Sequence, residues 1–225
     1  MLNPRLLLKE VCSLFLQATC PLCERPTLGE FCPTCEQQIQ KCQFKNPAQF
    51  WQAQPAVFAW GAYQDALKRT IAHLKYDNQP ALAEPLGQWL AQSWLAADLS
   101  RSRLIVVPIP MHPTKQQQRG YNQADLIAQS FCKFTGYPLR VRGLERLRST
   151  EALFGQSAGQ RSQSLAQAFG LGKEFRRDRP SAPVLLLDDI YTTGATVRSA
   201  IQTLRQAGIT VHGVAVVAKP ERWKT

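Results

Sequence analysis

The chain has 225 residues, and its 27 Lys and Arg residues outnumber its 16 Asp and Glu residues, which gives a formal net charge of +11. This length is enough for one α/β domain together with a small extra module. The apolar run Leu6 to Leu8 is followed at once by Lys9 and Glu10, so it is too short for a secretory signal or a membrane span. We therefore expect a cytoplasmic protein with no membrane span.

The first 42 residues hold six of the seven cysteines. A short amphipathic helix with Leu7, Val11, Leu14 and Phe15 on one face is predicted to come first. Two CxxC pairs follow, and their spacing favours a four-cysteine Zn²⁺ site because each tight turn supplies two soft thiolate ligands. Its predicted ligands are Cys20, Cys23, Cys32 and Cys35. Disulfides are the alternative, but no secretory signal supports them.

The sequence around the other cysteines gives them less definite roles. Cys42 is an alternative metal ligand, and Cys132 lies in an apolar helical pattern that is typical of a small buried side chain. We assign residues 1–45 to the zinc-binding module and residues 55–225 to a second domain, with Gln43 to Gln54 as the link. A module this small needs its metal to fold, and structural zinc typically supplies about 10 kcal/mol or more.

After the link, strand-like and helix-like apolar patterns alternate along the chain. Such alternation predicts βαβ units and a mostly parallel sheet with helices on both faces. The predicted strands are Ala56 to Trp60, Leu104 to Val107, Leu139 to Leu147, Val184 to Leu187 and Thr210 to Ala218. The predicted helices contain Leu67, Ile71 and Leu74; Leu82, Leu86, Trp89 and Leu90; Asn122 to Phe134; Leu165 to Phe169; and Val197, Ile201 and Leu204.

A polar segment connects the strand at Leu104 to the helix at Asn122. It begins with two prolines around Ile109, which end the strand sharply, and continues as a polar loop with Lys115 and Arg119. Such a loop can close over a pyrophosphate, neutralise its charge and exclude water. A surface loop before a helix capped by Asn122 is the alternative.

Basic residues concentrate in the middle of the chain. Residues 101–180 hold 14 basic and 5 acidic residues, a surplus of +9. If Leu139 to Leu147 is a strand, its alternate residues share one face, and these are Arg140, Arg142, Arg146 and Arg148. Arg176, Arg177 and Arg179 follow in a predicted loop. A polyanion such as single-stranded DNA is a plausible ligand of this face, and a solvated surface that steers small phosphorylated substrates is the alternative.

The segment VLLLDDIYTTGAT, Val184 to Thr196, joins a buried strand to two carboxylates and then to the start of a helix. Backbone N–H groups at a helix N-terminus, with the hydroxyls of Thr192, Thr193 and Thr196, form a cradle for a phosphate. Asp188 and Asp189 stand at the edge where parallel sheets bind ligands, and they can accept hydrogen bonds from sugar hydroxyls or hold hydrated Mg²⁺. The sequence has no Walker A or GxGxxG pattern.

This segment resembles the signature of type I phosphoribosyltransferases for 5-phosphoribosyl-1-pyrophosphate (PRPP). With CPLC, CPTC, VPIPMH and RGYNQA, the chain resembles the ComF family of competence-associated proteins along nearly its whole length. The resemblance implies the type I phosphoribosyltransferase fold, contacts of Asp188 and Asp189 to the ribose, and contacts of Thr192, Thr193, Gly194, Ala195 and Thr196 to the 5-phosphate. Thr192 replaces the Asp of hypoxanthine-guanine phosphoribosyltransferases, which argues against a 6-oxopurine acceptor.

Two classes of function follow. The first is an enzyme that uses Mg²⁺ and PRPP to transfer phosphoribosyl to an unidentified acceptor, with Asp188, Asp189, Lys115 and Arg119 as catalytic residues. The second is a factor without catalytic activity that senses PRPP or binds single-stranded DNA. The resemblance implies a role in natural transformation (DNA uptake), with other competence or DNA-processing proteins as partners.

Overall fold

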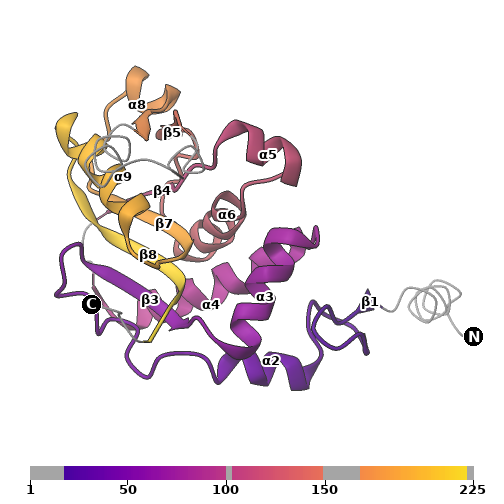
Figure 1. The fold of residues 1–225 in the computed structure, drawn as a ribbon. Helices are drawn as coiled ribbons and strands as arrows, with labels where there is room; N and C mark the ends of the chain where they lie inside the picture. Colours follow the sequence, from indigo (N-terminus) through magenta and orange to yellow (C-terminus); the bar gives the residue numbers. More distant parts are fainter. Residues whose placement is uncertain (1–17, 100–102, 149–167, 222–225) are drawn as a thin grey trace, which may run out of the picture.

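A computed structural model describes residues 18–99, 103–148 and 168–221 of the chain (Figure 1). The helix expected around Leu7 to Phe15, together with Cys12, lies outside the described residues. Among the described helices, none is long and apolar enough to cross a lipid bilayer. The elements in chain order are β1 (Ala18–Thr19), β2 (Pro26–Thr27), α2 (Pro33–Gln40), β3 (Val57–Ala62), α3 (Asp65–Tyr76), η1 (Pro80–Leu82), α4 (Ala83–Ala96), β4 (Ile105–Pro108), α5 (Pro113–Arg119), α6 (Gln123–Thr135), β5 (Leu144–Arg146), β6 (Phe169–Leu171), α8 (Lys173–Arg177), β7 (Val184–Ile190), α9 (Ala195–Gln206) and β8 (Val211–Lys219).

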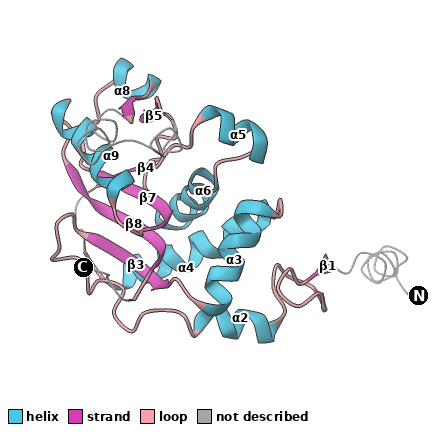
Figure 2. Cartoon of the chain, viewed as in Figure 1, coloured by secondary structure: helices cyan, strands magenta, loops and turns pink. Residues whose placement is uncertain are grey.

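The main sheet has four parallel strands in the order β3-β8-β7-β4. β7 lies between β8 and β4, where Leu187 is in register with Ala215 on one side and with Pro108 on the other. Figure 2 shows the sheet between helices on its two faces. The predicted α/β class is therefore confirmed, and so is the near-continuous apolar composition expected of strands covered on both faces.

Alternate residues of β7 contribute to two separate cores. Leu185 and Leu187 pack in the core that includes α3, α4 and α6, whereas Val184 and Leu186 face α9 and the region around β5 and β6. The helices α4 and α6 pack closely because Gly87 has no side chain. A Cβ at Gly87 would lie 2.6 Å from the carbonyl oxygen of Ile127.

The cysteine-containing module packs directly against the sheet domain. Cys42 O accepts a hydrogen bond from the backbone N–H of Ala62 at 2.8 Å, and a Cβ at Gly61 would lie 2.6 Å from the same oxygen. The rings of Phe31 and Trp89 stack with centroids 6.0 Å apart. These contacts join the module to β3 and α4, so its position relative to the sheet is set by packing.

The strand predicted over Leu139 to Leu147 is shorter in the structure. Only Leu144–Arg146 forms a strand, β5, which pairs antiparallel with β6 outside the main sheet. A turn precedes it, with the N–H of Gly143 donating to Arg140 O at 3.1 Å. Gly143 packs closely on Phe175 at this turn, where a Cβ would lie 2.9 Å from the ring. Arg140 and Arg142 therefore lie before the strand, and the prediction that the four arginines share one strand face is wrong.

Three other predictions need correction. The segment with Lys115 and Arg119 is the helix α5, which begins at Pro113 and ends before Gly120, whose φ is 85°. Proline preorganises a first helical turn, and a glycine with positive φ ends a helix. Arg176 and Arg177 lie in the short helix α8. Phe169 begins strand β6 instead of ending a helix, and residues 165–167 lie outside the described part.

Candidate functional site

The four cysteines of the two CxxC pairs lie together, as predicted. Their Sγ atoms are all within 4.8 Å of one another. Zn–S bonds of about 2.3 Å in a tetrahedron put sulfur atoms about 3.8 Å apart, so the cluster fits one tetrahedral metal ion after a small contraction. The four residues come from the turn after β1 and from the start of α2, where Cys32 is the N-cap.

The electrostatics of the cluster favour a cation. Burial acts to raise the pKa of Cys20, but backbone hydrogen bonds from Cys32 and Leu22 and the neighbouring thiols lower it to about 7. Burial and the thiols of Cys23, Cys32 and Cys20 raise the pKa of Cys35 well above its usual value. Four thiolates at this separation repel one another, and a divalent metal ion offsets that repulsion.

Cys42 and Cys132 lie apart from the cluster. The Cys42 Sγ is 3.5 Å from Gln38 O and 3.7 Å from Gln64 O, and Cys132 is buried in α6. Burial raises the pKa of Cys132 to about 12, which suits the predicted role of an inert, apolar side chain. All six described cysteines are free thiols.

We predict that the cluster binds one metal ion per chain and that Cys35→Ser lowers this stoichiometry, because three thiolates hold zinc more weakly than four. Metal analysis of purified protein after dialysis measures the effect. Cys42→Ser is the matched control and should keep the metal. Equal metal loss from both variants would contradict the assignment.

The second candidate site lies at the carboxyl end of β7. Asp188 and Asp189 are the fifth and sixth residues of this strand, one residue before its end at Ile190. Successive strand residues point to opposite faces, so the two side chains leave the strand on different sides. The carboxylate of Asp188 accepts a hydrogen bond from the N–H of Asp189 at 2.9 Å.

Asp189 forms an ion pair with Lys75 near the end of α3. The Lys75 Nζ is 2.9 Å from Asp189 Oδ2, and the two side chains are 17% and 5% exposed. Burial would lower the pKa of Lys75, but the carboxylates of Asp189 and Asp188 raise it above its usual value, so the lysine stays charged. Burial and the nearby Asp189 carboxylate raise the pKa of Asp188 well above its usual range. Lys75 was not among the residues singled out from the sequence.

We predict that Lys75→Met lowers the free energy of unfolding by about 3 kcal/mol, because it leaves the buried Asp189 carboxylate without its counter-ion. Urea denaturation measures the change, and Lys68→Met on the same helix should change it by less than about 0.5 kcal/mol. Adding Asp189→Asn to Lys75→Met should restore part of the loss. If the loss of unfolding free energy in the double variant equals the sum of the losses in the two single variants, the ion pair contributes nothing to stability.

The predicted phosphate cradle is a bend followed by α9. Gly194 is the N-cap of α9, with φ 73°, and the helix starts at Ala195. A Cβ at Gly194 would lie 2.2 Å from the Tyr191 hydroxyl oxygen, so only glycine fits this position. Thr192 and Thr193 are exposed. Two exposed threonines therefore come directly after the carboxylates, and the first N–H of α9, at Ala195, donates to Thr193 Oγ1 at 3.4 Å.

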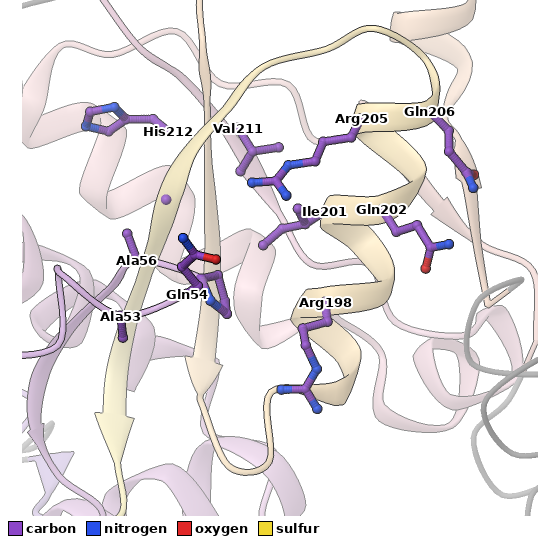
Figure 3. Close-up of a pocket in the computed structure, with 12 residues that line it drawn as sticks. Ala53, Gln54, Ala56, Arg198, Ile201, Gln202, Arg205, Gln206, Val211 and His212 are labelled. Atoms are coloured by element: carbon purple, nitrogen blue, oxygen red, sulfur yellow. The ribbon is translucent and has the colours of Figure 1, made fainter. Parts of the chain in front are cut away.

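Arg198 holds this loop from the first turn of α9. Its Nη1 donates to Thr193 O at 2.9 Å, and its charge and hydrogen bond act to lower the pKa of Tyr191 against burial. Further along α9, Ile201 and Arg205 point toward Val211 across a groove of about 660 Å³ that Gln54 also lines (Figure 3). This groove contains neither of the two aspartates, so it is separate from the candidate sugar site.

Lys115 and Arg119 line a cavity of about 720 Å³ that Lys75 also lines. Arg119 Nη1 donates to Gln123 Oε1 at 2.6 Å, and its guanidinium lies 5.5 Å from the centre of the Tyr76 ring. The cavity therefore brings the cations of α5 next to the lysine that contacts Asp189. A cationic pocket beside a carboxylate pair has the charges needed to bind Mg²⁺ and a polyphosphate.

The arginines proposed for nucleic-acid binding are in different surroundings. Arg140, Arg142 and Arg148 are exposed, whereas Arg146 is partly buried, with its guanidinium 5.4 Å from the centre of the Phe169 ring. Burial lowers the pKa of Arg146, and the charge of Asp188 acts in the opposite direction. Arg146 therefore lies close to the carboxylate site, and it also lines one cavity with Arg142 and donates from Nε to Arg148 O at 3.4 Å.

The parallel sheet, the carboxylate pair at the end of β7 and the helix-start loop define an α/β protein with a small four-cysteine module. A hypoxanthine phosphoribosyltransferase from Staphylococcus aureus aligns with a TM-score of 0.36 and 16% identity over 66% of this chain and 68% of that chain. No protein-family model matches the chain.

Three curated proteins are similar in sequence. Competence protein F of Haemophilus influenzae is 32% identical over 155 residues, which is 66% of each chain. DNA utilization protein YhgH of Salmonella typhimurium is 27% identical over 84% of this chain and 78% of its own length. Competence protein ComFC of Bacillus subtilis is 23% identical over 84% of this chain and 72% of its own length. The chain belongs to the ComF family of competence proteins.

Proposed function

We propose that the protein is a cytoplasmic phosphoribosyltransferase that binds PRPP with Mg²⁺ and acts in natural transformation. The observation that supports this most directly is the order of groups at the carboxyl end of β7: two carboxylates, a glycine-dependent bend with exposed hydroxyls, and a helix N-terminus. The names of the related proteins support the biological role.

In the proposed binding mode, each part of PRPP contacts protein groups of complementary charge or hydrogen-bonding capacity. Thr192 to Thr196 bind the 5-phosphate through backbone N–H groups and hydroxyls. Asp188 accepts hydrogen bonds from the ribose hydroxyls, and Asp189 contributes the one carboxylate oxygen, Oδ1, that does not contact Lys75. Lys115 and Arg119 bind the pyrophosphate and stabilise the charge that develops on it as the bond to the ribose breaks. Mg²⁺ would add to this neutralisation, with carboxylate oxygens as its protein ligands.

We assign Zn²⁺ to the four-cysteine cluster as a structural ion. The closed set of four thiolates leaves no open position for a substrate, which is typical of structural zinc sites. Its proposed role is to hold α2 against α3 and α4, because Ile39 and Phe31 belong to the same core as those helices.

We predict that Mg²⁺ with PRPP raises the melting temperature of the protein by mass action. The double variant Asp188→Asn with Asp189→Asn should lose most of this shift, because it removes the carboxylates that meet the ribose and the metal. Differential scanning fluorimetry measures the effect. The matched control is Asp178→Asn, an exposed residue beyond α8. A shift of wild-type size in the double variant would place the sugar elsewhere.

A second candidate function is a factor that senses PRPP or binds single-stranded DNA without catalysis. The net charge of +11, the exposure of Arg140, Arg142 and Arg148, and the relatives named for DNA utilization favour it. Because β5 is shorter than predicted, the arginines do not form one continuous face. We therefore expect any DNA to be bound through several separate phosphate contacts.

We predict that single-stranded DNA binding weakens with salt, with a log-log slope of about −0.7 for each phosphate neutralised. Arg140→Ala with Arg142→Ala should reduce the slope and leave the PRPP shift unchanged. Fluorescence anisotropy with a labelled oligonucleotide measures the salt slope, and differential scanning fluorimetry measures the PRPP shift. If saturating PRPP displaces all the DNA and the arginine substitutions have no effect, then DNA occupies the phosphate cradle.

Acceptor-dependent pyrophosphate release separates the enzyme from the factor without catalysis.

A further inference from the structure

The groove of about 660 Å³ beside α9 lies outside the sites assigned so far. Arg198, Ile201 and Arg205 line it from the helix, and the segment from Ala53 to Ala56 lines it together with Val211 at the start of β8 (Figure 3). Its volume is in the usual range for a small-molecule site. The groove is therefore large enough for a ligand that the proposed function does not use.

The three residues from α9 share one face of the helix. Arg198 and Ile201 are three residues apart, and Ile201 and Arg205 are four apart, which are the spacings of neighbours on a helix surface. Seven residues of helix rise about 10 Å, so the two arginines lie on either side of Ile201 along the groove. The helix thus presents two cations with an apolar side chain between them.

The groove carries a positive charge that no acidic group offsets. None of the described residues that line it is Asp or Glu. The Arg205 side chain is exposed and forms no ion pair or hydrogen bond with another described residue. A guanidinium binds a phosphate through two parallel N–H donors, so an arginine without a carboxylate partner is suited to a phosphorylated ligand.

The rest of the lining fits a flat and partly apolar group. Ile201, Val211 and Pro55 supply apolar surface, and the side-chain amide of Gln54 can both donate and accept hydrogen bonds, as the edge of a nucleobase does. The His212 ring points away from Arg205 in Figure 3 and packs against aromatic rings of the core. The groups that face the groove therefore match the phosphates and the base of a nucleotide.

Arg198 belongs both to this groove and to the loop assigned to the 5-phosphate of PRPP. It lines the groove, and its Nη1 donates to Thr193 O at 2.9 Å. A phosphate in the groove competes with Thr193 O for the guanidinium donors, because the phosphate carries the larger negative charge. A ligand in the groove would therefore remove a hydrogen bond that holds the phosphate loop.

We propose that the groove binds a nucleoside triphosphate, with its phosphates between Arg205 and Arg198, and that this binding opposes the binding of PRPP. The opposition rests on the proposed function, since it requires PRPP to occupy the loop that contains Thr193. Such coupling is reciprocal, so each ligand lowers the affinity for the other by the same factor.

The first experiment measures nucleotide binding in the absence of PRPP. Isothermal titration calorimetry with ATP, GTP, CTP and UTP, each added separately to the full chain, tests the groove. We expect at least one of them to bind, and its affinity to fall about tenfold or more in Arg205→Ala, because charge-assisted hydrogen bonds are lost. Gln54→Glu, which puts a negative charge opposite the arginines, should also weaken binding.

The matched control is Arg69→Ala, which removes the same charge from an exposed position of α3 that is outside the groove. It should bind the nucleotide as the wild type does. If no nucleoside triphosphate binds the wild-type protein, or if Arg205→Ala binds it as tightly, the proposal is overturned.

Two rival sites are tested in the same way. A triphosphate that binds at the proposed PRPP site would lose affinity in Asp188→Asn with Asp189→Asn and keep it in Arg205→Ala, which would overturn the proposal. A thymidine oligonucleotide offers phosphates from a nucleic acid instead of a free nucleotide. If Arg205→Ala weakens binding of the oligonucleotide while no nucleoside triphosphate binds, the groove is a nucleic-acid site and the proposal is overturned.

The second experiment measures the coupling. With Mg²⁺ in excess over both ligands, a saturating concentration of the nucleotide should weaken PRPP binding to the wild type about fivefold or more. The same nucleotide concentration should have little effect on Arg205→Ala, which keeps its PRPP affinity. Unchanged PRPP affinity in the nucleotide-bound wild type would overturn the coupling. A protein that binds the nucleotide through Arg205 but does not bind PRPP would contradict the proposed function and leave the groove assignment in place.

Discussion

Burial of β7 on both faces determines where the chemistry of this protein can lie. Val184, Leu185, Leu186 and Leu187 are all inaccessible to solvent, because β8 and β4 flank the strand and helices cover both of its faces. A charged side chain in that stretch would lose its hydration with no compensation. The carboxylates therefore come at the carboxyl end of the strand, where Asp188 reaches the surface and Asp189 meets Lys75.

The Lys75 ion pair links the sheet to α3 and also to the candidate pyrophosphate pocket. An unpaired carboxylate at the position of Asp189 would be unstable, so the lysine permits two adjacent aspartates at a buried strand end. The same lysine contributes positive charge to the cavity lined by α5. One side chain thus allows the carboxylate pair to exist and increases the attraction of the neighbouring cavity for anions.

Local sequence patterns predicted the elements that depend on local chemistry. The apolar run of β7, the Asn122 cap of α6 and the glycines after α6 and α9 all identify their elements because each works through neighbours in the chain. The paired CxxC motifs work in the same way. The C-terminal edge of a parallel sheet is also a general location for ligands, so the placement of Asp188 and Asp189 followed from topology.

The errors arose where distant residues decide the outcome. Leu139 to Leu147 has the alternation of a strand, but Gly143 packs on Phe175 and the chain turns there. Lys75 has no distinguishing pattern in its helix, since only the folded chain brings it to Asp189. The polar composition of Pro113–Arg119 concealed a helix that exposes most of its residues, because periodicity signals a helix only when one face is apolar.

Asp125 and Asp188 show how one fold can place two carboxyl groups in different electrostatic surroundings. Burial raises the pKa of both, but Asp188 has a second carboxylate beside it and the cations Lys75 and Arg146 opposing it, whereas Asp125 has only a neutral amide. When cationic ligands such as Mg²⁺ approach, Asp188 gains partners that favour its ionised form, and it remains a ligand. Asp125 accepts its hydrogen bond from Asn122, and burial raises its pKa to about 7.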